Sequence, residues 1–168
     1  SQGHRGRQVE AFTESVDVMP TILDACGADI PLQCDGFSLA GFLSGDEHEH
    51  WRDAVVWEMD FREISDGTPE HEIGVPLDLC CYAAIRDNRF KYIHFPGLPA
   101  AFYDLVTDPG EQKNLAQDPA FTAIMLVYAQ KLLSRRMAHA DRVLTGVLLT
   151  PDGPIERPRS DRLGPGMS

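Results

Sequence analysis

The sequence predicts an α+β fold in which a small antiparallel sheet of about four strands is covered by a long C-terminal helix and preceded by an N-terminal helix. Three observations support this fold class. Apolar runs with strand-like composition occur at 54–61, 79–85, 90–95 and 101–106. Turn-forming residues separate these runs. A helical apolar stripe then extends over about 119–138.

The composition is that of an ordinary globular chain with an acidic surface. The 168 residues are 43% hydrophobic and 24% charged, which suffices for one domain with a core. The formal net charge of -11 argues against nucleic acid as a partner, because phosphate binding needs a basic surface. No apolar run is long enough to span a membrane, and residues 1–7 lack the apolar core of a signal peptide, so we expect no membrane partner.

The four cysteines predict thiols rather than a disulfide or a zinc ribbon. Cys26, Cys34, Cys80 and Cys81 do not show Cys-x-x-Cys spacing. Cys80 and Cys81 lie in an apolar run, where reduced and packed thiols are favoured over a strained vicinal disulfide. A reducing cytoplasm therefore fits this sequence best.

The first predicted helix follows a truncated lead-in at residues 1–12. Its apolar stripe consists of Val18, Ile22, Leu23 and Cys26. Ser15 is a candidate N-cap, and Gly27 supplies the left-handed residue at which a helix stops. Pro20 is tolerated only near the first turn, which predicts a looser start just before it.

The segment between this helix and the sheet is mostly loop. Residues 38–43 predict a helix of one or two turns that ends at Gly45. An acidic loop with two histidines occupies 46–50. After the first strand, 63–76 form a polar loop rich in turn formers, which is long for a compact domain, and such loops are often functional.

The second and third strands form a predicted hairpin. Asp87-Asn88 separates them, and this pair suits backbone with positive φ, as in the tight turns of hairpins. Because side chains alternate along a strand, Lys91 and His94 fall on opposite faces. The strand at 101–106 then completes the antiparallel sheet.

A turn and a capped helix follow the last strand. Asp108 is expected to accept bonds from the backbone ahead of it, while Gly110 accommodates positive φ. Asp118 provides an N-cap and Pro119 the first helical position. The stripe of this helix consists of Phe121, Ile124, Met125, Tyr128, Leu132 and Leu133. Residues 144–149 form a weak strand or an extended segment, and 150–168 an irregular tail or arm rich in proline and glycine.

The residues reveal no catalytic centre. No nucleophile elbow, phosphate-binding loop or His-Glu-x-x-His is present, and His48-Glu49-His50 lacks a preorganised third metal ligand. We interpret Asp17 and Asp24 as capping or surface charges. Glu58, Asp60 and His94 are candidates for the rim of a substrate site. The alternatives are a solvated strand face for the two carboxylates and a packed histidine.

Four motifs in order resemble the sulfatase family over roughly residues 9–140. They are Val16-Asp-Val-Met-Pro-Thr-Ile-Leu-Asp-Ala-Cys-Gly27, Asp35-Gly-Phe-Ser-Leu39, Arg86-Asp-Asn-Arg-Phe-Lys-Tyr92, and Phe102-Tyr-Asp-Leu105 continued by Asp108-Pro-Gly-Glu111 and Asn114-Leu115. Together with Trp57-Glu58 and Lys91-Tyr-Ile-His-Phe95, they look closest to the phosphonate monoester hydrolase and arylsulfatase branch. The family belongs to the alkaline-phosphatase-like superfamily, and in it such motifs follow the main catalytic domain.

The resemblance implies an enzyme whose centre lies elsewhere. Relatives hydrolyse sulfate, phosphate or phosphonate esters with a formylglycine nucleophile and a divalent metal, Ca²⁺ or Mn²⁺. Formylglycine arises from Cys or Ser in a Cys/Ser-x-Pro/Ala-x-Arg motif, which no serine of this chain fits and whose fifth position must be Arg. Ile30, Ser38, Ala84 and Ile85 stand there instead after the four cysteines. The resemblance therefore implies no catalytic residue, metal ligand or cofactor in this chain, which matches only the C-terminal part of such an enzyme.

Two hypotheses remain open. In the first, residues 13–149 are the C-terminal subdomain of a sulfatase-like hydrolase that cleaves sulfate or phosphonate and phosphate esters, inactive without its N-terminal catalytic domain. Bare docking faces would then leave an exposed apolar patch and favour self-association into oligomers. In the second, the chain is a free-standing, non-catalytic binding or assembly module with the same fold.

Overall fold

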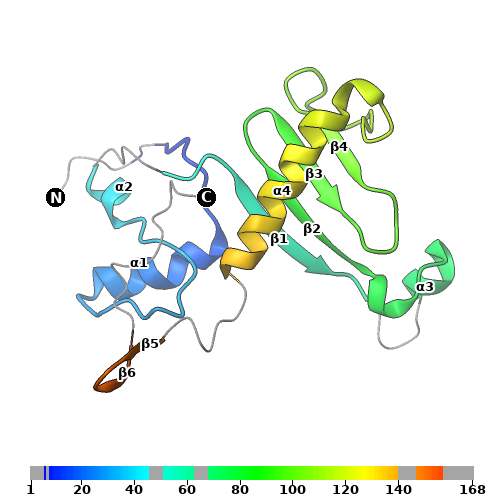
Figure 1. Cartoon of the computed structure of the whole chain (residues 1–168). Coiled ribbons are helices and arrows are strands. Elements are labelled where there is room, and N and C mark those ends of the chain that lie inside the picture. Colours follow the sequence, from blue (N-terminus) through cyan, green and yellow to red (C-terminus); the bar gives the residue numbers. More distant parts are fainter. Residues whose placement is uncertain (1–5, 7, 46–50, 63–67, 140–146, 157–168) are drawn as a thin grey trace. The chain divides into compact units, whose positions relative to one another are not determined.

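The computed structural model describes residues 6, 8–45, 51–62, 68–139 and 147–156. The chain forms two compact units (Figure 1). Unit 1 comprises residues 1–53 and 137–168, and unit 2 comprises 54–136. No helix in the described part of the chain has the length and apolarity needed to cross a membrane.

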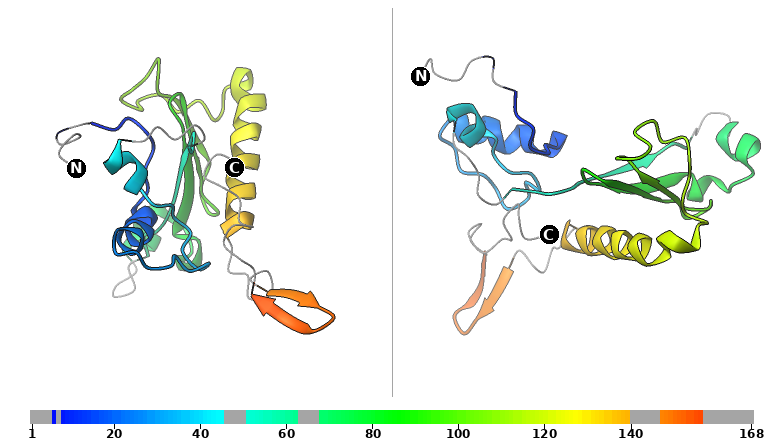
Figure 2. Two further views of the ribbon diagram at one scale, coloured as in Figure 1. Left: turned by 90° about the vertical axis from the view of Figure 1, so that its left-hand side faces the viewer. Right: turned by 90° about the horizontal axis from the view of Figure 1, so that it is seen from above.

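Unit 2 is built on a four-stranded antiparallel sheet. The strands are β1 (Val55–Asp60), β2 (Cys81–Arg86), β3 (Phe90–His94) and β4 (Ala101–Asp104), and they lie side by side in sequence order. Helix α4 (Thr122–His139) follows a short 3-10 turn at Pro119–Phe121 and lies along one face of the sheet (Figure 2). The predicted α+β fold, with its sheet, covering helix and N-terminal helix, is therefore confirmed.

Aromatic rings fill the space between α4 and the sheet. Phe102 on β4 is completely buried, and its ring stacks on Phe90 with centroids 5.1 Å apart. Tyr128 of α4 meets both rings edge-on, at 5.6 and 5.7 Å. The buried cluster also contains Leu132 of α4, Leu115, and Ala83, Ile85 and Tyr92 of the sheet. The apolar stripe thus faces the sheet as predicted.

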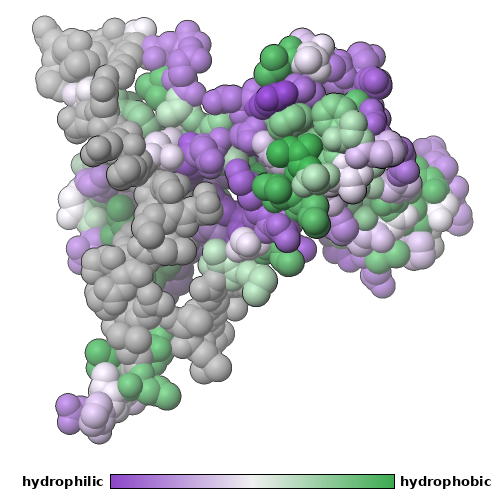
Figure 3. All heavy atoms as spheres, turned by 45° about the horizontal axis from the view of Figure 1, so that its top comes forward, coloured by the Kyte–Doolittle hydropathy of each residue, from purple (hydrophilic) through white to green (hydrophobic). Residues whose placement is uncertain are grey.

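The prediction is wrong for one residue of the stripe, Leu133. Leu133 is 59% exposed, because it follows Leu132 by 100° and so points away from the sheet. Other apolar residues share that outward side, and Figure 3 shows hydrophobic residues gathered on the visible surface of unit 2.

Two turns differ from the sequence-based expectation. Neither Asp87 nor Asn88 has positive φ; instead the Asp87 carboxylate accepts the backbone N–H groups of Arg89 and Phe90, both at 2.8 Å. Past the last strand, Glu111 takes the left-handed conformation, with φ of 54°, rather than Gly110. Asp108 does accept the backbone N–H of Lys113 at 2.8 Å, as expected.

Unit 1 contains two short helices that stop at the glycines predicted to end them. Helix α1 (Val18–Ala25) follows a 3-10 turn at Ser15–Asp17, so the looser start before Pro20 is confirmed. Helix α2 spans Ala40–Ser44. Gly27 and Gly45 end the two helices with φ of 70° and 91°. Glu14, rather than Ser15, is the residue at the N-cap.

The loops and the tail hold structure that the sequence did not indicate. Helix α3 (Thr68–Ile73) forms within the polar loop predicted at 63–76. Strand β5 (Val147–Thr150), which overlaps the weak strand predicted at 144–149, pairs with β6 (Gly153–Glu156) in an antiparallel hairpin, so 150–156 is not irregular as predicted. The predicted loop at 46–50 lies outside the described residues.

Candidate functional site

Two of the three rim candidates lie in one row across the sheet of unit 2. The register pairs Glu58 on β1 with Ala83 on β2, and Ala83 with His94 on β3. Directly paired residues of an antiparallel sheet point to the same face. Because neighbouring strands are about 4.8 Å apart, the backbones of Glu58 and His94 are separated by about 10 Å. The small Ala83 side chain stands between them.

Each end of this row has a polar partner. Glu58 Oε1 lies 2.6 Å from Arg136 Nε of α4 in an ion pair. The Tyr92 hydroxyl lies 3.3 Å from His94 Nδ1. Burial raises the pKa of Tyr92, so its hydroxyl keeps its proton and can donate to the imidazole. The row can therefore present a carboxylate at one end and, at the other, an imidazole positioned by the Tyr92 hydroxyl.

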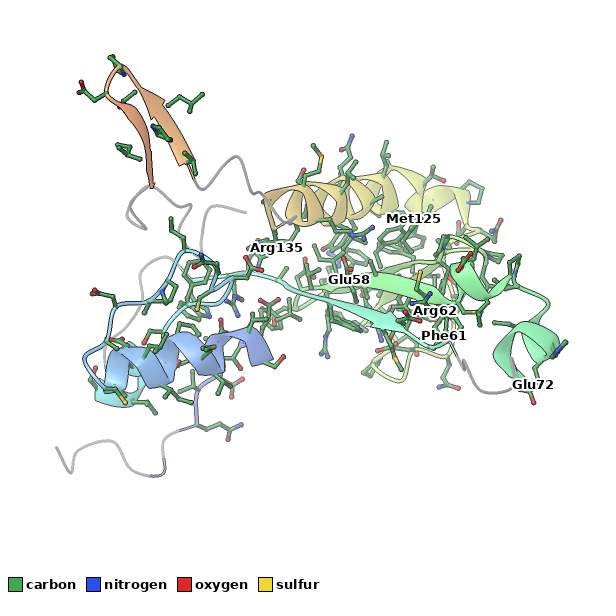
Figure 4. The ribbon with its side chains drawn as sticks, turned by 90° about the horizontal axis from the view of Figure 1, so that it is seen from below. Glu58, Phe61, Arg62, Glu72, Met125 and Arg135 are labelled. Atoms are coloured by element: carbon green, nitrogen blue, oxygen red, sulfur yellow. The ribbon has the colours of Figure 1, made fainter. Side chains whose placement is uncertain are left out.

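Asp60, the third candidate, is engaged in a local ion pair at the end of β1. Arg62 Nε donates to both carboxylate oxygens of Asp60 at 2.8 Å, and the Arg62 guanidinium also lies 3.9 Å from Asp78. Figure 4 shows Arg62 and Phe61 near the end of β1. Hydrogen bonds from Arg62 hold the pKa of Asp60 below its usual range. Both side chains are exposed, so this pair contributes little to stability.

A buried ion pair in unit 1 is the feature that the sequence-based reasoning missed. Asp17, expected at the surface, is fully buried at the start of α1 and binds the Arg52 guanidinium through both oxygens, at 2.5 and 2.7 Å. Arg52 also lies 3.2 Å from Glu14. The capping role predicted for Asp17 is nevertheless present, because its carboxylate accepts the backbone N–H of Glu14 at 2.8 Å.

Several contacts stabilise the charges of this buried pair. Burial by itself would raise the pKa of Asp17. Hydrogen bonds from Arg52 and from the backbone of Glu14 and Phe37 outweigh burial, and the pKa is lowered. The guanidinium carbon lies 5.6 Å from the ring centroid of Phe37 and 5.2 Å from that of Trp51, within the range of cation–π contacts.

The Asp35-Gly36-Phe37 motif positions this pair. The backbone N–H of Phe37 donates to Asp17 at 2.9 Å, which brings the motif against the start of α1. A Cβ at Gly36 would lie 2.1 Å from the Val16 carbonyl oxygen, so any other residue there would force the two segments apart. The pair is 35 residues apart in sequence, and no local pattern could have revealed it.

The residues that the structure describes do not form a metal-dependent ester hydrolase centre. Within the described part of the chain, no three His, Cys, Asp or Glu side chains are placed to hold a metal ion. Asp60 and Glu58 are each paired with an arginine. Asp108 and Asn114 serve the backbone: Asn114 Oδ1 accepts the N–H groups of Phe102 and Ala116, at 3.0 and 2.9 Å.

One family model and several known proteins are similar to this chain. The family model described as "N-sulphoglucosamine sulphohydrolase, C-terminal" matches residues 1–138. The chain is 45% identical over 150 residues to the multifunctional alkaline phosphatase superfamily protein PehA of Trinickia caryophylli, covering 89% of this chain and 29% of that protein. It is 32% identical over 114 residues to a Δ4,5-hexuronate-2-O-sulfatase of Bacteroides thetaiotaomicron, covering 66% and 21%.

Solved structures give the same relationship. The phosphonate monoester hydrolase of Agrobacterium radiobacter superimposes with a TM-score of 0.84 and 48% identity, over 93% of this chain and 31% of that one. A phosphonate monoester hydrolase from Silicibacter pomeroyi gives a TM-score of 0.82 and 35% identity, over 91% and 30%. This chain thus spans less than a third of the length of the proteins it matches.

Proposed function

This chain belongs to the N-sulphoglucosamine sulphohydrolase C-terminal family of the sulfatases, and we propose that it is the C-terminal part of a hydrolase that cleaves sulfate esters or phosphonate and phosphate esters. The observation that carries this proposal is the combination of near-complete coverage of this chain with only 31% coverage of a phosphonate monoester hydrolase. We propose sulfate esters as well as phosphonate and phosphate esters as substrates, because the relatives include sulfatases and phosphonate hydrolases.

The chemistry of such a parent enzyme would reside outside this chain. The family resemblance implies a formylglycine nucleophile and a divalent metal, Ca²⁺ or Mn²⁺. None of the four cysteines has the arginine that formylglycine formation requires. We therefore expect the 168-residue chain to be inactive by itself and to act by supporting an N-terminal catalytic domain.

Helix α1 supplies the surface for that domain. Three apolar residues of α1 are exposed, Val18 by 54%, Met19 by 63% and Ile22 by 58%. The helix nevertheless ends at Gly27 and begins at the buried Asp17–Arg52 ion pair. An apolar helix face that is exposed on a structured unit marks a docking surface. Adding a charge there should weaken association with the catalytic domain without unfolding α1.

The rim candidates give the chain a second role in this proposal. Glu58, Asp60 and His94 would lie near the mouth of the substrate site and act on substrate binding rather than on chemistry. In the full-length parent, His94→Ala is then expected to raise KM while leaving kcat nearly unchanged. An equal loss in kcat with KM unchanged would contradict the rim role.

The test compares the chain with its parent. The 168-residue chain is assayed with an aryl sulfate and a phosphonate monoester in the presence of Mn²⁺, alone and after co-expression with the remaining part of the parent. We expect turnover only in the second case. Ile22→Glu should weaken this complementation, whereas Leu43→Glu, which adds the same charge at an exposed residue of α2, serves as the matched control. Metal-dependent turnover by the chain alone would refute the proposal.

A second candidate is a free-standing binding or assembly module. The closed aromatic core of unit 2 favours it, because that unit has what an independent domain requires. The intact mass of the protein in its native source decides between the two: a polypeptide of this length supports the module. For either candidate we propose a reducing compartment such as the cytoplasm, since none of the four cysteines, all within the described residues, is in a disulfide and the Cys26 thiol is exposed.

A further inference from the structure

Polar contacts from a distant part of unit 1 converge on residues 12–17, at the start of α1. The Trp51 indole N–H donates to the Phe12 carbonyl oxygen at 2.6 Å, across 39 residues of sequence. Its neighbour Arg52 binds the Asp17 carboxylate and lies 3.2 Å from the Glu14 carboxylate. These five residues, Phe12, Glu14, Asp17, Trp51 and Arg52, are named the clasp.

Two aromatic rings hold the indole of the clasp in place. The rings of Phe37 and Phe42 meet the Trp51 ring edge-on, with centroids 6.3 and 4.8 Å from it. Such contacts restrict the plane of an aromatic ring. The Trp51 N–H is therefore directed at the Phe12 carbonyl by its own surroundings and does not simply follow that backbone as it moves.

The segment that the clasp holds has no regular structure of its own. Residues 8–14 form neither helix nor strand. Without a ladder of backbone hydrogen bonds, contacts with other segments determine the course of such a stretch. Trp51 acts on it at residue 12, and Arg52 acts at residue 14 and again at Asp17, just before α1. The clasp thus fixes the angle at which the chain enters α1.

The clasp is better suited to fixing positions than to adding stability. Arg52 is 3% exposed, and its Nε has no hydrogen-bond partner in the part of the chain that the structure describes. A buried N–H without a partner costs free energy, and desolvation offsets most of the attraction in a buried ion pair. A planar guanidinium bound to both oxygens of one carboxylate nevertheless restricts the pair to a single geometry.

We propose that the clasp is a rigid joint between this chain and the catalytic domain of the parent hydrolase, with Trp51 and Arg52 as its positioning residues. This inference rests on the proposed function, in which that domain lies N-terminal to this chain and docks on α1. Residues 8–14 are then the connection between the domain and its docking surface. A connection held at one angle favours docking, because it removes conformational freedom that association would otherwise have to overcome.

Pulsed electron paramagnetic resonance of the full-length parent provides the first test. One spin label is attached to Cys26, which is exposed at the end of α1, and the other to a surface cysteine introduced into the catalytic domain, after the other reactive cysteines are replaced by serine. We expect a narrow distribution of distances for the intact clasp. Trp51→Phe keeps a ring but loses the indole N–H, and should broaden the distribution.

Trp57→Phe is the matched control for this variant. It makes the same chemical change on β1, outside the clasp, and should leave the distribution narrow. A distribution that is as narrow in Trp51→Phe as with the intact clasp would overturn the proposal, and so would equal broadening by both variants.

Hydrogen exchange locates the effect within the chain. The amides of Glu14 and Asp17 are hydrogen-bonded in the clasp. Trp51→Phe should speed their exchange about tenfold in the full-length parent, as expected for the loss of one hydrogen bond. Asp118→Ala removes a helix cap in unit 2 and should leave their exchange unchanged. Equal acceleration by both variants would mean that overall stability holds this segment, and would contradict the clasp.

Arg52→Lys separates geometry from charge. Lysine keeps the positive charge beside Asp17 but lacks the planar fork that binds both carboxylate oxygens. The distance distribution should therefore broaden as it does in Trp51→Phe. A distribution that stays narrow would show that charge alone suffices, and would refute the positioning role of Arg52.

The joint and the proposed hydrolase fail in different ways. A native protein no longer than these 168 residues would refute both, because no domain would then be joined. A longer protein that cleaves neither ester but shows the expected broadening would refute the hydrolase and support the joint. Narrow distributions in every variant of an active hydrolase would refute the joint alone.

Discussion

Units 1 and 2 are stabilised in different ways. In unit 2, rings of Phe90, Phe102 and Tyr128 lie in contact between a helix and a sheet, away from water. In unit 1, the fully buried side chains include the charged Asp17, and the apolar residues of α1 are largely exposed. Unit 1 is thus organised around a buried ion pair and unit 2 around packed aromatic rings, although both units expose some apolar side chains.

The core of unit 2 mainly supplies folding stability, whereas the ion pair of unit 1 mainly determines which segments pack together. Apolar burial at about 25 cal/mol per Å² drives folding of unit 2. A buried ion pair adds little net stability, because desolvation offsets its attraction, but it fixes the segments that it joins. Unit 1 is therefore expected to depend on a partner that covers α1. Each unit contains one tryptophan, Trp51 in unit 1 and Trp57 in unit 2, so single-tryptophan variants can follow the two separately.

Removal of the central ring of unit 2 should have the largest effect. Phe102→Ala deletes a completely buried side chain that touches rings on the sheet and on α4, and we expect a loss of about 4 kcal/mol. Urea unfolding of the Trp51→Phe background, with Trp57 as the reporter, measures it. A loss of the same size for Phe121→Ala, which is only partly buried at the edge of the core, would argue against a central role for Phe102.

Breaking the ion pair of unit 1 should come next. Arg52→Met leaves Asp17 as an uncompensated buried charge, and we expect a loss of about 3 kcal/mol. Adding Asp17→Asn removes that charge but keeps an oxygen for the backbone N–H groups, so the double variant should recover part of the loss. Trp51 fluorescence in the Trp57→Phe background reports on unit 1. Equal losses for the single and double variants would show that charge is not the cause.

Acid should affect unit 1 more than unit 2. The pKa of Asp17 is lowered on folding, so its contribution is complete above the pKa of the unfolded carboxyl group. It is then lost as the pH falls through the still lower pKa of the folded state. In unit 2, Asp60 also has a lowered pKa, but it is exposed and screened by water. Urea midpoints of the two single-tryptophan variants, measured from neutral pH into this acid range, test the difference, and Asp17→Asn should remove it.

The smallest effect concerns the start of the helix in unit 2. The Asp118 carboxylate accepts the backbone N–H of Ala120 at 3.0 Å. Asp118→Ala should cost about 1 kcal/mol, and Asp118→Ser should restore most of it because serine also caps helices. Thermal unfolding followed by circular dichroism measures both. A loss that serine does not restore would show that Asp118 acts otherwise than as a cap.

Sequence reasoning succeeded where local patterns determine structure. The period of the α4 stripe, the Asp118-Pro119 start and the glycine that ends α1 each depend on neighbours within a few residues. The family resemblance likewise rests on contiguous motifs. Even here the local rule chose Gly110 for the left-handed residue, whereas Glu111 adopts it. The Glu111 carboxylate binds Lys91 at 2.7 Å, a long-range contact that accompanies this choice.

The misses share a physical cause. The pairing of Asp17 with Arg52 spans 35 residues, and a charged residue at a helix start is ordinarily a cap at the surface. The hairpin of β5 and β6 joins a segment predicted as a weak strand to one predicted as irregular. The partners of Glu58 and Asp60 also come from tertiary placement or from a neighbouring loop. Burial and partnership of a charge depend on the whole fold, which no short window of sequence contains.

The Asp87 carboxylate suggests the order in which unit 2 assembles. One of its oxygens closes the β2–β3 turn, and the other accepts the hydroxyl of Tyr128, 41 residues further along the chain. Hairpins form in about 1–10 μs, whereas closing a longer loop carries a larger entropic cost. We expect the turn to order before α4 docks, so that Tyr128→Phe accelerates unfolding and leaves the folding rate almost unchanged. One side chain would then take part in both the first and the last step of assembly.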